Sequence, residues 1–494
     1  MIKRHKTAIK RYKLSRPVFL LTEHNLLHNE VTFFDYGCGH GQDTQILKKN
    51  GFRNINQFDP FYFPDKELIP SELVNLGYVL NVIENPKERR ETLIKAFSLA
   101  KVAICVSVMV RSATRNSTFN QYNDGEISTR GTFQKYFEQT EFKNYLESTL
   151  NADAIPLEPG IFVVFKSEIA KLEYLSSRYT RRSFLEVTKL DKPTGEVHKV
   201  RILKKKLEEL IPESPFFPQV VKAVEEFGRM LMPNEFEPFD QLLSEYKSKK
   251  KIEGIILENI NEDTYLNNRA IRIEEILVFM ALRRFDRNGF PKKKDLPEKL
   301  KLDIEKFLGS YREVITQAEK LLFSIGNESI MRESFRAAPI GKNLPQALYI
   351  HSEYVQSLPA PLQVKVGVAK SLVGSVEDCT IIKINKLKDK ISFLIYEDFI
   401  KVPHPVLLYS YSVDLRKNYV DFWDFRNREN PPILHRKETF IDKAHPKYKL
   451  FCKLSKAEKE KGLLSLPNIG TKINWENLLQ SKNLKLKGHS LNSI

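Results

Sequence analysis

A short apolar run that ends in an acid and continues into three closely spaced glycines is the clearest chemical signal in the sequence. The acid is Asp35, and the glycines are Gly37, Gly39 and Gly41. The apolar run predicts a buried strand, and glycines after a strand let the backbone turn sharply and pass close to a bound molecule. Strand and loop units of this kind hold nucleoside cofactors. We therefore expect Asp35 and the three glycines to contact a cofactor.

A second acid in the same region is suited to bind a ribose. Asp59 ends the segment 55–59, which predicts another short strand, and an acid at this position can accept hydrogen bonds from both ribose hydroxyls. The glycines are spaced more tightly than in a dinucleotide-binding turn. With the acid before them, they resemble the first motif of Rossmann-like methyltransferases, and this resemblance implies S-adenosylmethionine rather than a dinucleotide. The alternative is a plain glycine turn, with Asp59 capping an ordinary connection.

Positive charge dominates the composition. The 494 residues include 79 Lys and Arg against 62 Asp and Glu, a formal net charge of +17. This excess favours attraction to polyanions, so DNA is an expected partner, although a solvated lysine surface gives the same count. A basic arm precedes the first acid, Glu23, and is predicted to contact phosphates or to close over the cofactor. The arm contains Lys3, Arg4, Lys6, Lys10, Arg11, Lys13 and Arg16.

The sequence gives no signal for a membrane span, a disulfide framework or a metal. No apolar run approaches the thickness of a bilayer, and no apolar signal core follows the first basic residues, so we expect a cytoplasmic protein. The four cysteines are scattered without a Cys-x-x-Cys pair. Neither a disulfide nor a zinc site is therefore predicted.

The distribution of elements predicts an α/β protein with three regions. Residues 1–170 alternate strands and helices, as in a Rossmann-like methyltransferase domain; residues 171–350 form a charged helical region; and residues 351–494 form a small mixed or β-rich domain. Few residues separate Asp59 from Leu73, and they include three prolines, so the sheet is predicted to lack a strand there. Strands of the first region are expected at 31–35, 55–59, 72–81, 102–110 and 160–165.

Several segments resemble the DNA phosphorothioation-associated methyltransferases of bacterial DNA-modification and defence islands. They are residues 5–9 with 15–17, 35–41, 75–84 and 131–136. The first and last are the more specific, because very many methyltransferases share the glycine loop. The resemblance covers most of the chain. It implies S-adenosylmethionine as cofactor, DNA as a partner and proteins of a DNA-modification system as further partners.

Two polar residues near the end of the strand expected at 72–81 are candidates for catalysis. Asn81 and Glu84 follow it in the sequence, and open α/β sheets bind their ligands beyond the carboxyl ends of the strands. They are therefore placed to face the transferred methyl group or the acceptor. Helix capping ahead of Pro86 is the alternative of equal weight.

The segment before residue 137 is a candidate for substrate contact. Thr132, Gln134 and Lys135 supply hydrogen-bond donors, and Tyr136 supplies an aromatic face, which together suit a base or a phosphate. A surface loop that enters a helix is the structural alternative. The family resemblance favours substrate contact.

Methyl transfer requires alignment of the acceptor more than covalent help, so a missing catalytic base excludes nothing. No Pro-Cys pair follows the segment that ends at Asn81, which argues against attack on a cytosine ring carbon. We expect a methyltransferase that acts on DNA or on a component of a DNA-modification system. One alternative is a nucleic-acid-binding defence module that keeps the cofactor fold without methyl transfer, and another is methylation of a small molecule or protein. The acceptor atom, the target sequence and the oligomeric state stay open.

Overall fold

The computed structural model describes residues 2–112, 120–178, 207–376 and 378–493, which form two compact units. One unit combines Met1–Ser167 with Ser324–Ile494, and the other is Glu168–Phe323. The expected boundary near residue 170 lies close to Glu168. The region expected at 351–494 belongs to the first unit, and residues 179–206 of the expected helical region lie outside the described residues.

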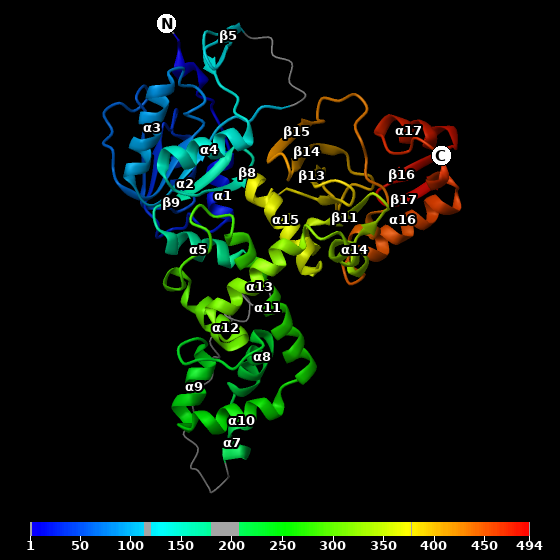
Figure 1. Cartoon of the computed structure of the whole chain (residues 1–494). Coiled ribbons are helices and arrows are strands. Elements are labelled where there is room, and N and C mark those ends of the chain that lie inside the picture. Colours follow the sequence, from blue (N-terminus) through cyan, green and yellow to red (C-terminus); the bar gives the residue numbers. More distant parts are fainter. Residues whose placement is uncertain (1, 113–119, 179–206, 377, 494) are drawn as a thin grey trace. The chain divides into compact units, whose positions relative to one another are not determined.

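The first unit contains a six-stranded sheet in the order β2-β1-β3-β4-β9-β8 (Figure 1). The neighbouring strands β2, β1, β3 and β4 run parallel to one another. The strand β9 is antiparallel to both of its neighbours, β4 and β8. This arrangement confirms the predicted Rossmann-like core. The strands are β1 (Phe33–Tyr36), β2 (Ile55–Phe58), β3 (Ser71–Gly77), β4 (Ala100–Ser107), β8 (Ala154–Glu158) and β9 (Ile161–Phe165).

Apolar side chains cover both faces of the sheet, as parallel strands require. Every residue of β1 and β9 is buried. Phe34, Val74 and Ile104 share one core with α3 and α4, and α1 contacts β3 and β4. The helices of this part are α1 (Arg16–Glu23), α2 (Gln42–Lys49), α3 (Pro86–Leu99) and α4 (Gln139–Leu150).

The sheet ends at β2, as the short connection after Asp59 predicted. The described residues between Asp59 and Ser71 form only an isolated bridge, from Asp59 to Phe63. The strand expected at 72–81 ends earlier, at Gly77, because Tyr78 adopts a left-handed backbone conformation with φ of 58°. That conformation breaks an extended strand.

A second sheet, entirely antiparallel, forms the C-terminal half of the first unit. Its order is β10 to β15 in sequence, and α14 and α15 pack on it around Phe393 and Leu362. Its strands are β10 (Lys342–Asn343), β11 (Ala347–His351), β12 (Ile381–Asn385), β13 (Lys390–Tyr396), β14 (Leu407–Asp414) and β15 (Tyr419–Asp424). The helices are α14 (Glu328–Ala337), α15 (Ala360–Val373), α16 (Tyr448–Glu460) and α17 (Lys472–Ser481), and a hairpin of β16 (Leu484–Lys487) and β17 (Ser490–Ser493) follows.

Close backbone packing joins this half to the first sheet. Gln139 Nε2 on α4 donates to the carbonyl oxygen of Leu372 at 2.8 Å, and Ser375 N donates to that of Leu157 at 3.0 Å. Gly374 has φ of 87°, and a Cβ there would lie 2.3 Å from the Leu157 oxygen. Only glycine fits such a contact.

The second unit is helical where it is described. Asp303, which is buried, accepts hydrogen bonds from Arg229 Nε at 2.7 Å and Arg272 Nε at 2.9 Å, and so ties two helices to the turn that carries Arg229. No helix of the described residues is long and apolar enough to cross a membrane. The helices are α5 (Glu168–Ser177), α7 (Leu207–Glu213), α8 (Phe217–Phe227), α9 (Glu237–Tyr246), α10 (Lys249–Asn259), α11 (Glu262–Arg283), α12 (Glu298–Leu308) and α13 (Tyr311–Ser324).

A smaller antiparallel sheet lies between β4 and α4 in the sequence. It contains β5 (Asn120–Tyr122), β6 (Gly125–Ile127) and β7 (Phe133–Gln134). This sheet carries the segment 131–136 that the sequence selected for substrate contact.

Candidate functional site

The glycine loop follows β1 with all three glycines in the left-handed region. Gly37, Gly39 and Gly41 have φ of 80°, 55° and 72°. A Cβ on Gly37 would lie 2.4 Å from Val79 Cγ2, and one on Gly41 would lie 2.8 Å from Gln57 Oε1. Side chains at these positions would therefore strain the backbone and collide with neighbours. The loop is a cradle that only glycine can form.

Asp59 lies against this loop, at the end of β2. Its Oδ2 accepts a hydrogen bond from Gly39 N at 3.0 Å, and its Oδ1 accepts from Phe61 N and Tyr62 N, both at 2.9 Å. The structure thus brings together the two elements that the sequence assigned to one nucleoside site. Because a carboxylate offers about four lone-pair positions, one remains on Oδ2 for a ribose hydroxyl.

Asp35 is buried at the floor of the loop. Its Oδ1 accepts a hydrogen bond from Asn75 Nδ2 at 2.8 Å, across the β1 and β3 pair. Burial, and next the negative charge of Asp43, raises the pKa of Asp35 from 3.8 to about 7. A positively charged group bound near the loop would favour the ionised carboxylate.

The N-terminal arm lies over the same loop. A Cβ on Gly39 would be 3.1 Å from Ala8 Cβ. Beside it, the ring of His5 stacks on Phe61 with centroids 4.1 Å apart, and Tyr62 Oη donates to the His5 carbonyl oxygen at 2.9 Å. The arm therefore covers the glycine cradle from outside.

Glu84, one of the two candidates for catalysis, is a partner of this arm. Its Oε2 accepts from Arg4 Nε at 2.7 Å, and Arg4 also pairs with Glu88. The Arg4 guanidinium holds the pKa of Glu84 below its usual range. Glu84 is thus ionised and engaged in fixing the short 3-10 helix Arg4–Thr7.

Asn81, the other candidate, lies beyond the early end of β3. Its side chain is buried, and its Oδ1 has no hydrogen-bond partner among the described residues. Its carbonyl oxygen accepts from Lys135 N at 2.8 Å, which links this turn to the segment 131–136. A buried amide oxygen without a donor is suited to receive one from a ligand.

The four residues expected to contact substrate are placed differently from one another. Thr132 Oγ1 lies 2.6 Å from Ser128 Oγ, and Gln134 Nε2 donates to the Lys135 carbonyl oxygen at 3.4 Å. Lys135 Nζ pairs with Asp124 at 3.1 Å and with Glu141 at 2.8 Å. Among the four, Tyr136 lines the cavity described next.

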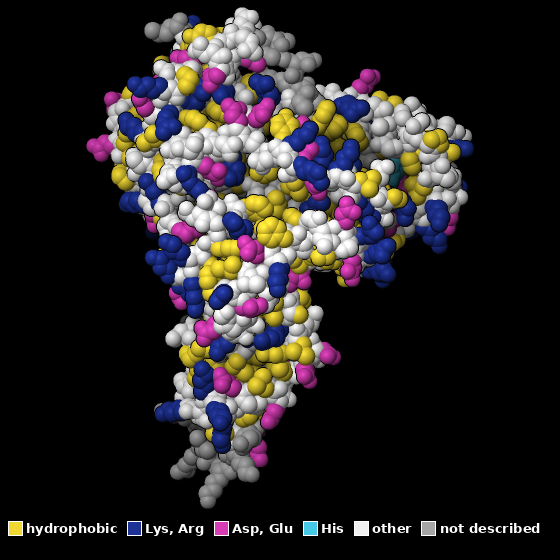
Figure 2. Space-filling view, viewed as in Figure 1, with side chains coloured by type: hydrophobic (Ala, Val, Ile, Leu, Met, Phe, Trp, Pro, Cys, Tyr) yellow, Lys and Arg dark blue, Asp and Glu magenta, His cyan; other side chains and the backbone are white. Residues whose placement is uncertain are grey.

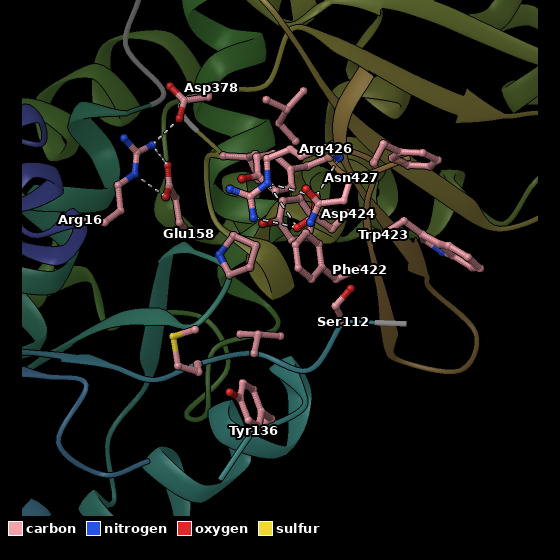
Figure 3. A pocket seen from close by; sticks show the side chains of 18 of the residues that line it. Arg16, Ser112, Tyr136, Glu158, Asp378, Phe422, Trp423, Asp424, Arg426 and Asn427 are labelled. Atoms are coloured by element: carbon pink, nitrogen blue, oxygen red, sulfur yellow. Dashed lines mark hydrogen bonds and ion pairs between the residues drawn. The ribbon is translucent and has the colours of Figure 1, made fainter. Parts of the chain in front are cut away.

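A cavity of about 1100 Å³ opens within the first unit at the carboxyl ends of β3 and β4 (Figure 3). Tyr78 and Val108, which follow those strands, form part of its wall. Val79, next to Tyr78, packs against Gly37. The cavity and the glycine loop therefore share the edge of the sheet where open α/β sheets bind ligands.

Aromatic and arginine side chains from the C-terminal half form the opposite wall. Tyr411 and Phe422 stack with centroids 4.7 Å apart, and the Arg426 guanidinium lies 4.7 Å from the centre of the Tyr409 ring. Trp423 also lines the cavity and is 43% exposed. Such a wall suits a flat, polarisable group, such as a nucleobase.

Ion pairs hold the charged residues of the wall. Arg16 Nε donates to Glu158 Oε2 at 2.8 Å, and its Nη2 lies 2.8 Å from Asp378 Oδ2. Arg426 pairs with Asp424 at 2.8 Å. These pairs orient the guanidinium groups, and they leave the wall close to neutral. Of these residues, sequence reasoning selected only Arg16, as part of the basic arm, although the aromatic residues and arginines clustered at 422–428 were a usable signal.

The cysteines near the site are unsuited to nucleophilic attack. Burial raises the pKa of the Cys38 and Cys105 thiols well above their usual range, so both are protonated at neutral pH. The described cavity wall includes no cysteine. Neither cysteine therefore supplies a thiolate to the described cavity.

No protein-family model matches the chain, and no curated protein matches it. Among solved structures, it is similar to 1,6-didemethyltoxoflavin-N1-methyltransferase of Burkholderia thailandensis with bound 1,6-didemethyltoxoflavin and S-adenosylhomocysteine, with 14% identity and a TM-score of 0.24 over 31% of this chain and 77% of that one. It is also similar to PigF with SAH, with 13% identity and a TM-score of 0.22 over 30% of this chain and 54% of that one. The apo S-adenosylmethionine-dependent methyltransferase SibL shows 12% identity and a TM-score of 0.22 over 31% and 53%. The chain thus spans just over half of the last two proteins.

Proposed function

We propose that this chain is an S-adenosylmethionine-dependent methyltransferase that acts on DNA. The observation that carries the proposal is the contact between Gly39 N and Asp59 Oδ2 at 3.0 Å, which forms one nucleoside-binding corner at the edge of the sheet where the aromatic cavity opens. S-adenosylmethionine supplies an activated methyl group when bound. Asp35, the glycine cradle and Asp59 would hold it.

The role of the protein would then be to align the acceptor. Tyr78 and the aromatic wall of the cavity would hold a base flat beside the cofactor corner. Alignment of this kind supplies most of the barrier reduction in a direct transfer. We place the protein in a DNA-modification system related to phosphorothioation, and the family resemblance of residues 5–9, 15–17 and 131–136 supports this.

Calorimetric binding of S-adenosylmethionine tests the cofactor site. Asp59→Asn removes the charge and keeps the shape, and we expect at least tenfold weaker binding because charged hydrogen bonds to the ribose are worth about 1.5–3 kcal/mol. Glu67→Gln, an exposed acid in the same connection, is the matched control and should bind like the wild type. Equal affinity in Asp59→Asn would contradict the assignment.

Transfer itself is tested with labelled cofactor and duplex DNA, with and without phosphorothioate linkages. Label in DNA supports the enzyme, and a preference for the phosphorothioate duplex supports the link to that modification. Label in a protein or small-molecule fraction would contradict DNA as the acceptor.

A nucleic-acid-binding module without transfer is a second candidate. Coverage of the glycine cradle by Ala8, and the absence of a strand beyond β2 among the described residues, favour it. Salt-dependent DNA binding without any incorporated label would support this second function.

A further inference from the structure

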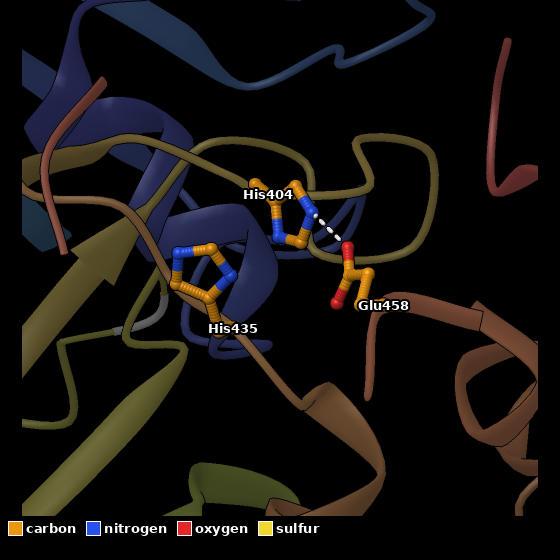
Figure 4. Close-up of side chains that lie close together, drawn as sticks. All are labelled: His404, His435 and Glu458. Atoms are coloured by element: carbon orange, nitrogen blue, oxygen red, sulfur yellow. Dashed lines mark hydrogen bonds and ion pairs between the residues drawn. The ribbon is translucent and has the colours of Figure 1, made fainter. Parts of the chain in front are cut away.

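Two histidines and a glutamate form a buried cluster in the C-terminal half of the first unit (Figure 4). His404 lies before β14, His435 follows β15, and Glu458 lies on α16. Their candidate ligand atoms all lie within 4.8 Å of one another. Glu458 is fully buried and His404 is 7% exposed. None of the three lines the cavity of the proposed active site.

The hydrogen bond of His435 determines which of its nitrogens is free. Nε2 lies 2.7 Å from the carbonyl oxygen of Ile469, so it carries the proton and donates it. Nδ1 of the neutral ring therefore has a lone pair, and this buried atom has no partner among the described residues. A histidine with one N–H held by a backbone carbonyl and the other nitrogen free is prepared to bind a metal.

His404 Nε2 and Glu458 Oε1 share one hydrogen bond, whose proton a bound metal ion would displace. His404 Nδ1 lies 3.3 Å from the Leu434 carbonyl oxygen, and donation there leaves a lone pair on Nε2. That nitrogen lies 2.7 Å from Glu458 Oε1, while Glu458 Oε2 is buried without a partner among the described residues. Three electron-rich groups thus converge in a buried place, which a cation would stabilise.

We propose that His404 Nε2, His435 Nδ1 and the Glu458 carboxylate bind one zinc ion. Two imidazole nitrogens and a carboxylate are a usual ligand set for zinc, at about 2.0–2.2 Å from the ion. Tetrahedral ligands at that distance are about 3.3–3.6 Å apart. His404 Nε2 and Glu458 Oε1 lie 2.7 Å apart and all the ligand atoms lie within 4.8 Å of one another, so small side-chain rotations would bring them to these separations.

The ion would join three segments that are distant in sequence. His404 and Glu458 are 54 positions apart, and His435 lies between them. The indole of Trp475 on α17 packs edge-on against both imidazoles, with ring centroids 5.0 Å and 4.6 Å away, and holds their orientation. Because none of the three residues lines the cavity, the ion would act outside the proposed active site, and a water molecule would complete its tetrahedron.

Metal titration of the full-length protein after chelation tests the site. We expect one equivalent of Zn²⁺ to bind and to raise the melting temperature. Co²⁺ should bind in the same place and give the visible absorption bands of a tetrahedral complex. No stoichiometric binding of either ion and an unchanged melting temperature would overturn the proposal and leave a hydrogen-bonded histidine and glutamate pair.

His435→Gln isolates the ligand role. The Gln amide can still donate to the Ile469 carbonyl oxygen, but it lacks the Nδ1 ligand, so we expect at least about 100-fold weaker zinc binding. His28→Gln, at an exposed histidine, should bind like the wild type. Equal zinc affinity in wild type and His435→Gln would overturn the proposal, and if His435→Gln does not fold, the Co²⁺ titration of the wild type decides.

Discussion

At the scale of single residues, backbone conformation and close contact make the glycine loop intolerant of any side chain. The three glycines and Tyr78 all have positive φ and lie at the same sheet edge. Positive φ in a residue with a bulky side chain is costly and concentrates at functional sites. The strain at Tyr78 is therefore a structural sign of the site that the sequence alone did not give.

A comparison of Gly37→Ala with Gly51→Ala separates the effect of a Cβ clash from the cost of a positive φ. Both positions have positive φ, so each substitution costs about 1–2 kcal/mol. Only at Gly37 would the Cβ meet another group, Val79 Cγ2 at 2.4 Å, while nothing lies within 4 Å of the Gly51 position. We expect Gly37→Ala to lower the free energy of unfolding further and to weaken S-adenosylmethionine binding. Equal unfolding curves for the two variants in urea would contradict the crowding at Gly37.

The raised pKa of Asp35 predicts that the affinity for the cofactor depends on pH. Since its folded-state pKa is raised to about 7, the carboxyl is protonated below that pH. Binding of a positively charged cofactor that needs the ionised form should weaken about tenfold for each pH unit below 7. Asp35→Asn keeps the acceptor for Asn75 and should bind weakly without this dependence. A wild-type affinity that is flat between pH 5 and 8 by calorimetry would contradict the expectation.

The raised pKa of Asp35 also predicts how the free energy of unfolding changes with pH. The pKa of Asp35 in the folded protein is raised above its ordinary value of 3.8. The protonated side chain therefore stabilises the fold, and this contribution is fully present below pH 3.8. The contribution is lost as the pH rises through about 7. Asp35→Asn should therefore raise the melting temperature more at pH 8 than at pH 4.

At the scale of elements, the N-terminal arm is the part most directly coupled to the cofactor corner. Its 3-10 helix is held by the pairs from Arg4 to Glu84 and Glu88, and Ala8 lies over Gly39. The sequence predicted that a basic arm would contact phosphates or close over the cofactor. The structure places it over the glycine loop, with Arg4 paired to acids of the same unit.

Arg4→Gln should loosen this cover. Partly exposed ion pairs contribute at most about 1 kcal/mol, so the fold should persist. We expect faster association of a fluorescent S-adenosylhomocysteine analogue in stopped-flow experiments, because the arm would leave the loop more often. Arg53→Gln, at an exposed arginine, is the control. An unchanged association rate in Arg4→Gln would mean that the cofactor enters without movement of the arm.

At the scale of the whole molecule, the C-terminal half supplies the wall that makes the cavity. Without β14, β15 and the residues after them, the carboxyl ends of β3 and β4 would lack their aromatic partner. The charged residues of the cavity wall are paired, Arg16 with Glu158 and Asp378 and Arg426 with Asp424, and Figure 2 shows Lys and Arg interspersed with acidic residues over the face in view. Stacking rather than charge is therefore the specific attraction in the cavity.

Trp423→Ala tests the stacking wall. Loss of one stacked base costs about 1–3 kcal/mol, so DNA affinity should fall about 5-fold to 150-fold. Tyr419→Ala is a matched control, because it lies on the same strand with 38% exposure and outside the cavity wall. Fluorescence anisotropy at constant salt measures both, and S-adenosylmethionine affinity should stay unchanged. Equal DNA affinities of the two variants would contradict a base at this wall.

The sequence by itself determined the local features that a few neighbouring residues fix. Glycine spacing and apolar runs gave the loop after β1, the position of Asp59 and the parallel core, because strand formation and tight turns depend on nearby residues. The short connection after Asp59 likewise predicted the missing strand. Only the tertiary structure decided which distant side chains meet. Packing between elements brings together residues that are distant in sequence, and no local spacing encodes such contacts. Examples are the pair of Arg4 and Glu84, the aromatic wall opposite Tyr78, and the cluster of His404, His435 and Glu458.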